Sequence, residues 1–109
     1  MNAEKLAEAA PLFAALGDKT RLSIVARLCT DGPLSIVRLC EGSKISRQAV
    51  TKHLNALSDS GLVRSDLAGR ERIFKLEPKR LAEVRRHLDR ISQQWDAAID
   101  RLRAFVEDD

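Results

Sequence analysis

Residues 36–57 read IVRLCEGSKISRQAVTKHLNAL, and this stretch decides the fold. Ser35 precedes it and can cap a short helix that ends near Gly42, and Ser46 can cap a second helix. Apolar residues at helical steps are expected to hold the two helices at a fixed angle: Leu39, Ile45, Val50 and Leu54. A short helix, a tight turn and a second capped helix together have helix-turn-helix spacing.

The opposite face of the second helix is polar and is expected to remain in solvent. With the cap, its residues form the predicted recognition surface: Ser46, Arg47, Gln48, Thr51, Lys52, His53 and Asn55. An Arg and a Gln in the first turn have the fork geometry that reads guanine and adenine edges in duplex DNA, and the helix N-terminus can donate to phosphate. The pattern therefore favours a recognition helix over about residues 46–60. An ordinary helical hairpin with a solvated face is the alternative.

After Gly61 the pattern changes to two short runs, 62–67 and 70–76, joined by Ala68-Gly69. Such runs predict a β-hairpin, here over about residues 62–76. Its cations are expected to neutralise DNA phosphates near the hairpin tip, and they are Arg64, Arg70, Arg72 and Lys75. Arg70 at the tip is expected to enter a minor groove. Phe74 is predicted to pack inward, which leaves no aromatic ring on this surface for stacking on single strands.

Two helices are predicted before residue 36. The first runs from a cap at Asn2 to Leu16, and its apolar stripe is Leu6, Ala9, Ala10, Phe13 and Leu16. The second is capped by Asp18 and stopped by Gly32-Pro33, and its stripe is Leu22, Val25, Leu28 and Cys29. Cys29 and Cys40 are both interpreted as small core residues, because two cysteines at this spacing match no disulfide framework or zinc motif.

A long last helix is predicted from Pro78 to about residue 107. Its apolar residues follow alternating steps of three and four: Leu81, Val84, Leu88, Ile91, Trp95, Ala98, Leu102 and Phe105. A helix of about 40 Å shows more apolar surface than this small core can cover. We expect a homodimer whose interface contains Phe13, Leu16, Leu88, Ile91, Trp95, Leu102 and Phe105. A monomer with this helix folded onto its own core is the alternative.

Charge is unevenly distributed along the chain. The formal net charge is +3, but residues 44–90 carry 12 basic and 6 acidic side chains, whereas residues 91–109 carry 2 basic and 5 acidic ones. The acidic end contains Asp96, Asp100, Glu107, Asp108 and Asp109. The basic middle suits double-stranded DNA, and the acidic end is expected to lie far from it.

Composition bounds the class of protein. With 109 residues, 44% hydrophobic and 32% charged, the chain suits one domain over residues 1–109 that is mainly helical with a small β-hairpin. No apolar run approaches the roughly 18 residues of a membrane span, and we expect a cytoplasmic protein.

The sequence shows no phosphate loop, nucleophile elbow or acid-base pair, so we expect no enzyme and no cofactor. A winged helix that binds another protein is the main rival to DNA binding.

Four stretches resemble the ArsR/SmtB family of bacterial repressors. They are LGDKTRL at 16–22, SRQAVTKHL at 46–54, SGLV at 60–63 and GRERIFKL at 69–76. The resemblance implies a winged helix-turn-helix dimer, joined through its first and last helices, that represses an operon and releases its operator when a ligand binds.

The resemblance does not identify the ligand that this chain senses, because the chain departs from the family's ligand-sensing motifs. Metal-sensing members carry a Cys-x-Cys pair on the third helix, but residues 34–39 contain no thiol. Glu83, His87 and Asp89 on the last helix, or a thiol pair of Cys29 and Cys40, are weaker sensor alternatives. An unknown small-molecule inducer remains a further alternative, and no metal site is predicted.

Overall fold

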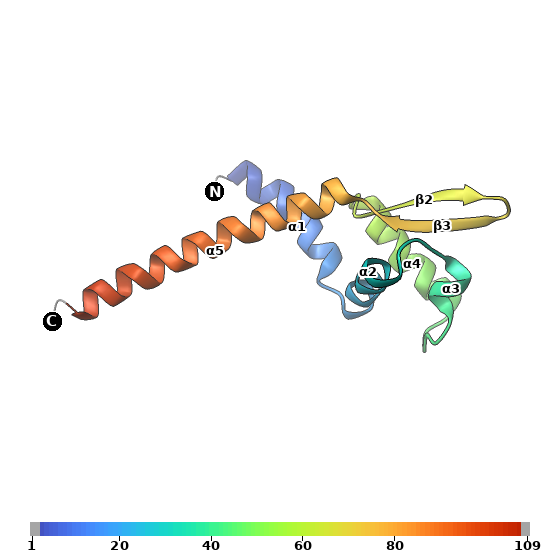
Figure 1. Cartoon of the computed structure of the whole chain (residues 1–109), viewed down its shortest axis with the longest axis horizontal. Helices are drawn as coiled ribbons and strands as arrows, with labels where there is room; N and C mark the ends of the chain where they lie inside the picture. The colour runs from blue at the N-terminus through green and yellow to red at the C-terminus, as the bar shows by residue number, and fades with distance from the viewer. Residues whose placement is uncertain (1–2, 108–109) are drawn as a thin grey trace.

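The computed structural model describes residues 3–107 and shows a winged helix-turn-helix fold, which confirms the predicted fold class. Its elements are α1 (Ala3–Leu16), α2 (Lys19–Asp31), β1 (Leu34–Ser35), α3 (Ile36–Cys40), α4 (Arg47–Asp59), β2 (Val63–Ala68), β3 (Glu71–Leu76) and α5 (Pro78–Glu107). Figure 1 shows the helix-turn-helix and the hairpin at one end of the molecule and α5 projecting from it. The predicted cap at Asn2 lies outside the described residues.

The helix caps form as the sequence predicts. The side chains of Asp18, Ser35 and Ser46 each accept a hydrogen bond from a backbone N–H of the first turn that follows. These bonds satisfy donors that a helix start leaves unpaired, so each helix begins at a defined residue. At the other end of α4, Gly61 adopts a φ of +82°, which turns the chain from the helix into β2.

The hairpin belongs to a three-stranded antiparallel sheet with strand order β1-β3-β2. Ala68 pairs with Glu71, so the turn is made by Gly69 and Arg70, one residue later than the predicted Ala68-Gly69. Strand β1 was not predicted, because two residues are too short to show an alternating pattern. It pairs with β3 and so ties the start of α3 to the hairpin.

The core lies where α1, α2, α4 and the sheet meet. Its most completely buried side chains are Leu12, Val50, Leu54, Leu57, Leu62 and Val63. Phe74 is also buried, as predicted, whereas Ile45, expected between the two helices, is exposed. The central position of α4 follows from this packing, because three of its residues are almost without exposed surface.

Two predicted apolar stripes are wrong in part. In α1 the buried residues are Ala9, Leu12 and Ala15, whereas Leu6 and Ala10 are exposed. In α2 they are Ile24, Val25 and Leu28, whereas Leu22 and Cys29 are exposed. Each helix carries apolar residues around more than one face, and the neighbouring elements select which face is buried. Cys29 is therefore not a core residue, and Cys40 is half-buried.

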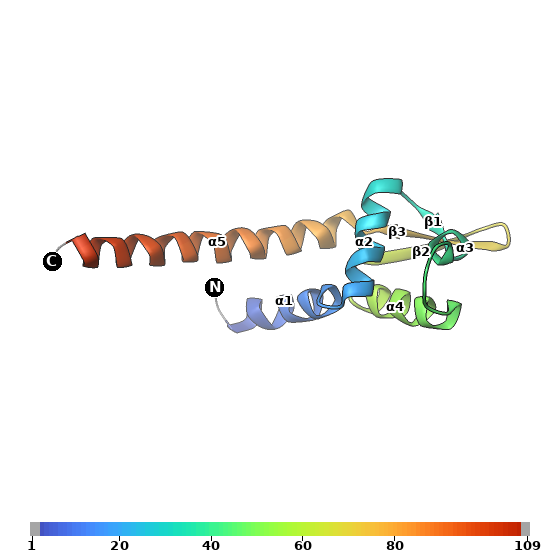
Figure 2. The same ribbon diagram turned by 90° about the horizontal axis from the view of Figure 1, so that it is seen from below.

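Among the described residues, the buried contacts of α5 lie in its first turns. Val84 and His87 are its buried residues, and Leu81 is half-buried against the core. The later part of α5 extends past the end of α1, as Figure 2 shows, and gives the molecule dimensions of 68 × 28 × 21 Å. Among the described residues, no helix has the length and apolar character to cross a membrane.

Candidate nucleic-acid interface

The N-terminal part of α4 presents four exposed polar side chains. The Ser46 hydroxyl accepts from the backbone N–H of Ala49 at 3.1 Å and fixes the helix start. Because Val50, Leu54 and Leu57 face the core, the side chains on the other face remain in solvent, and they include Arg47, Gln48, Lys52 and Asn55. Arg and Gln are present in the first turn, where a recognition helix reads bases, and Lys52 follows one turn later.

Thr51 and His53 differ from the other predicted recognition residues. The Thr51 hydroxyl donates to the backbone carbonyl of Arg47 at 2.9 Å. His53 points toward the start of α2, where its Nδ1 lies 3.7 Å from Asp18 Oδ2 and 3.5 Å from Arg21 Nη1. Both side chains are half-buried, and the protein itself engages the Thr51 hydroxyl and His53 Nδ1.

Arg21 on α2 also bonds the C-terminal end of α1. Its Nε donates to the Ala15 carbonyl at 2.6 Å and its Nη2 to the Ala14 carbonyl at 3.2 Å. The last carbonyls of a helix lack intrahelical partners and carry partial negative charge, which a guanidinium satisfies. No role for Arg21 could be predicted from the sequence, because an Arg near a helix start is ordinarily a solvated side chain.

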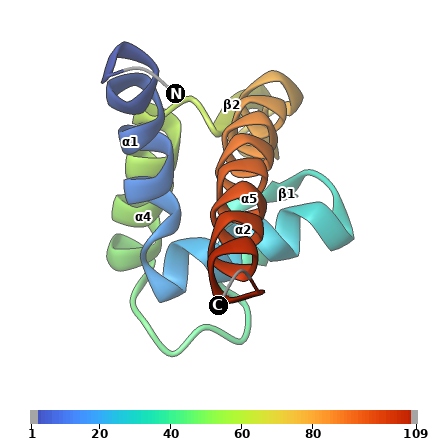
Figure 3. The same cartoon turned by 90° about the vertical axis from the view of Figure 1, so that its left-hand side faces the viewer.

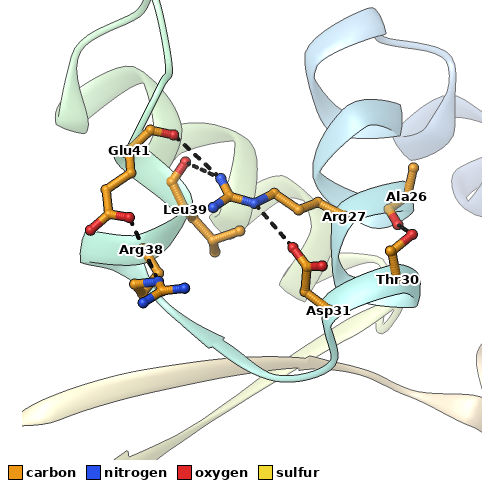
Figure 4. A network of polar contacts seen from close by, with 7 residues as sticks. All are labelled: Ala26, Arg27, Thr30, Asp31, Arg38, Leu39 and Glu41. Atoms are coloured by element: carbon orange, nitrogen blue, oxygen red, sulfur yellow. Dashed lines mark hydrogen bonds and ion pairs between the residues drawn. The ribbon is translucent and has the colours of Figure 1, made fainter.

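A second arginine of α2 makes the equivalent contact with α3. Arg27 Nη1 lies 3.4 Å from the Leu39 carbonyl and 3.5 Å from that of Glu41, and its Nε lies 3.6 Å from Asp31 (Figure 4). These distances are long, and each contact is correspondingly weak. Helix α2 thus connects to the C-terminal ends of α1 and α3 through one arginine each.

In the hairpin, ion pairs and hydrogen bonds engage most of the predicted cations. Arg64 pairs with Glu77 at 3.0 Å, and Lys75 pairs with Asp66 across the strands at 2.8 Å. Arg72 Nη1 donates to the Ser65 hydroxyl at 2.9 Å. The bond from Lys75 to Asp66 holds the pKa of the Asp66 carboxyl below its usual value. Among the described residues, Arg70 makes no hydrogen bond or ion pair, and it lies beside Gly69 at the tip.

The hairpin and the start of α4 share a cleft of about 270 Å³. Arg47 of α4 and both Arg70 and Arg72 of the hairpin line it. The rest of its wall is Ser35, Ile36, Val37, Leu67 and Glu71. Residues from two predicted DNA-binding elements, more than twenty positions apart in sequence, therefore meet at one concave surface that carries three arginines and one glutamate.

The predicted dimer surface has two different parts. Phe13 and Leu16 were expected to be exposed, but they are half-buried and pack against the core. The α5 residues are exposed: Leu88, Ile91, Trp95, Leu102 and Phe105, the last two by 66% and 72%. Ile99 and Val106 widen this apolar face. In Figure 3, α1 and α5 run side by side with α5 continuing toward the viewer.

The residues of the weaker sensor alternatives lie on α5, for Glu83, His87 and Asp89, and on α2 and α3, for Cys29 and Cys40. Among residues 3–107, no group of three or more His, Cys, Asp and Glu side chains is arranged to hold a metal ion. Glu83 pairs with Arg80 at 2.9 Å, and the buried His87 ring meets Phe13 edge-on with ring centroids 6.5 Å apart. Cys29 and Cys40 are both free thiols.

Comparison with known proteins agrees with this geometry. A model of a helix-turn-helix domain matches residues 16–66. The chain is 38% identical over 93 residues to the HTH-type transcriptional regulator Rv2034 of Mycobacterium tuberculosis, covering 85% of this chain and 83% of that protein. It is 30% identical over 95 residues to the arsenical resistance operon repressor of Escherichia coli, covering 87% and 79%. A solved ArsR-like transcriptional regulator from Rhodococcus sp. RHA1 has a TM-score of 0.78 and 37% identity, covering 94% and 96% of the two chains.

Proposed function

Because this chain belongs to the ArsR/SmtB family of DNA-binding, winged helix-turn-helix transcriptional regulators, we propose that it is a homodimeric repressor whose α4 and wing grip one operator. The wing is the β2–β3 hairpin, residues 63–76. One observation carries the proposal: Arg47 of α4 and Arg70 and Arg72 of the wing line a single cleft. A duplex that lies across this surface is contacted by the helix in its major groove and by the wing at the adjacent backbone.

The exposed residues divide into base readers and phosphate contacts. Arg47 and Gln48 in the first turn of α4 are assigned to base edges, because bidentate side chains at this position reach furthest into the groove. Ser46, Lys52, Asn55 and the wing cations are assigned mainly to the DNA backbone. Arg70 is the wing residue assigned to the minor groove, since it lies at the tip with its guanidinium available.

The exposed apolar face of α5 supports the dimer. Large exposed side chains continue along the helix from Leu88 to Val106, far beyond the last contact with its own core. Burying such a face against a second copy removes apolar surface from water at about 25 cal/mol per Å². Two-fold symmetry then presents two α4 helices to half-sites about 34 Å apart.

The Escherichia coli relative is named as a repressor of the arsenical resistance operon, and for this chain we assign repression to occupancy of the operator. The test begins with selection of bound duplexes from a random pool, followed by measurement of the dissociation constant across a salt series. A steep decrease in affinity with salt and a partly palindromic consensus are expected. Binding to a partner protein but to no duplex at low salt overturns the proposal in favour of a protein-binding winged helix.

A further inference from the structure

The three polar residues that meet between α1, α2 and α4 form a joint beside the recognition surface. Here we call Asp18, Arg21 and His53 the polar joint. His53 belongs to α4 but only 24% of its side chain is exposed, and its Nδ1 faces Asp18 and Arg21 of the α2 start. The Nδ1 atom of the ring therefore faces the start of α2.

One guanidinium serves acceptors from two other helices. Arg21 bonds the Ala14 and Ala15 carbonyls through Nη2 and Nε, and its remaining Nη1 lies 3.5 Å from His53 Nδ1. In the neutral ring with its proton on Nε2, Nδ1 is an acceptor and completes this set. The planar fork of Arg can satisfy all three acceptors at fixed angles, which the single ammonium of Lys cannot do.

Asp18 contacts the backbone of Arg21 and lies near its charge. Its carboxylate accepts the backbone N–H of Arg21 at 3.0 Å, and that bond, together with the nearby Arg21 charge, holds the pKa of Asp18 below its usual value. The carboxylate therefore remains ionised beside Arg21 and His53. The same residue caps α2, so the position of the charge is linked to the start of the helix.

We propose that Arg21 is a positioning residue for DNA binding, which sets the orientation of α4 relative to α1 through His53. The inference rests on the proposed function, because it concerns how well α4 enters a groove. Apolar packing between α1, α2 and α4 brings the helices together and sets their broad arrangement. The polar joint is directional, and it connects the recognition helix to α1, which lies against the α5 dimer helix.

The first experiment compares binding to the selected operator with binding to a random duplex of equal length. Arg21→Gln removes the three-way contact and is expected to decrease the ratio of operator affinity to random-duplex affinity by about tenfold, the equivalent of one lost charged hydrogen bond. The slope of log affinity against log salt is expected to stay unchanged, because Arg21 neutralises no phosphate. Lys19→Ala, which removes an exposed cation two residues earlier, is the matched control, and it should leave the affinity ratio intact.

The second experiment identifies which ring nitrogen of His53 matters. His53→Asn places an amide oxygen near the position of Nδ1 and is expected to preserve the affinity ratio, whereas His53→Gln places its amide near Nε2 and is expected to lose it about as Arg21→Gln does. The reverse order would mean that His53 contacts DNA through Nε2 and would overturn the inference. Circular dichroism melting of each variant checks that it is folded at the assay temperature.

The controls separate the possible failures. A wild-type protein that binds no duplex defeats the proposed function. If wild-type protein binds and Arg21→Gln retains the affinity ratio, only the positioning role is overturned. A decrease that affects both duplexes equally indicates lost folded protein or lost charge, and it also contradicts the role. If Arg21→Gln does not fold, the His53 pair supplies the same test.

Discussion

The polar side chains of α4 make different kinds of contact although they lie on one helix. Arg47 and Gln48 are exposed in the first turn, whereas Thr51 is bonded to its own backbone and His53 to the start of α2. A sequence pattern separates polar from apolar faces, but it does not show which polar side chains have partners inside the protein. Within α4, the residues assigned to DNA are thus those whose donors remain available.

Arg47→Ala and Gln48→Ala should change sequence preference rather than only affinity. Each variant removes one assigned base contact, and the expected loss is about 1–3 kcal/mol at the base pair that it reads, with little change elsewhere in the site. Repeating the duplex selection with each variant measures the preference at every position. A uniform weakening across all duplexes would show that these residues bind only the backbone.

Asp18 predicts an acid-dependent part of the stability. Its pKa is lowered in the folded state, chiefly by the Arg21 backbone N–H, so its contribution is complete above the usual carboxyl pKa and is lost as the pH decreases through the lower folded value. Asp18→Ser keeps a capping hydroxyl without the charge and should flatten this acid decrease in the free energy of unfolding. Urea titrations from pH 6 to about pH 2 measure it, and parallel curves for the two proteins would refute the assignment.

The wing depends on its turn and on a few contacts between its strands. Gly69 has a φ of +65°, and the contacts Lys75 to Asp66 and Arg72 to Ser65 join β2 to β3 behind it. These contacts hold the tip that carries Arg70 at the cleft shared with α4. The wing cations that are paired therefore shape the hairpin, and Arg70 extends from it.

Arg70→Ala should lower the salt dependence of DNA binding. Removing one available cation from the tip is expected to reduce the slope of log affinity against log salt by about one. Arg64→Ala is the matched comparison, because Arg64 is engaged with Glu77 and should change the slope less. Equal slopes for wild type and Arg70→Ala would place the wing tip away from DNA.

Caps, glycine stops and the hairpin could be predicted from sequence because each depends on residues close together in the chain. Ser46, Asp18 and Gly61 are examples, since each acts on its own turn. The buried faces of α1 and α2 could be predicted only in part. Packing against elements distant in sequence buries Leu12 rather than Leu6 in α1, and Ile24 rather than Leu22 in α2. The polar joint could not be predicted, since Arg21 and His53 meet only after three helices have packed.

The shape of the protein argues for a second copy. It is 68 Å long because α5 leaves its own core after about three turns and carries exposed Trp95, Leu102 and Phe105 into solvent. Acidic residues gather along the same outer half of the helix, and Asp96 and Asp100 lie among the exposed residues. The proposed DNA-binding surface of α4 and the wing and the proposed dimer face of α5 thus lie toward opposite ends of the molecule, and the acidic part lies at the far end from the wing.

Trp95→Asp should convert dimers to monomers. An unpaired carboxylate at the centre of the apolar face would be costly to bury, and the protomer core does not use Trp95, which is 68% exposed. Light scattering measures the mass, and circular dichroism should show an intact fold. An unchanged dimer mass would move the interface to another surface.

The most direct measurement is the stoichiometry of the complex with a selected operator, determined by analytical ultracentrifugation at low salt. Two chains per duplex are expected, bound at two related half-sites about one DNA turn apart, with the complex dissociating steeply as salt increases. A single chain bound to an unpaired half-site, or no complex with any duplex, would contradict the dimeric repressor described here.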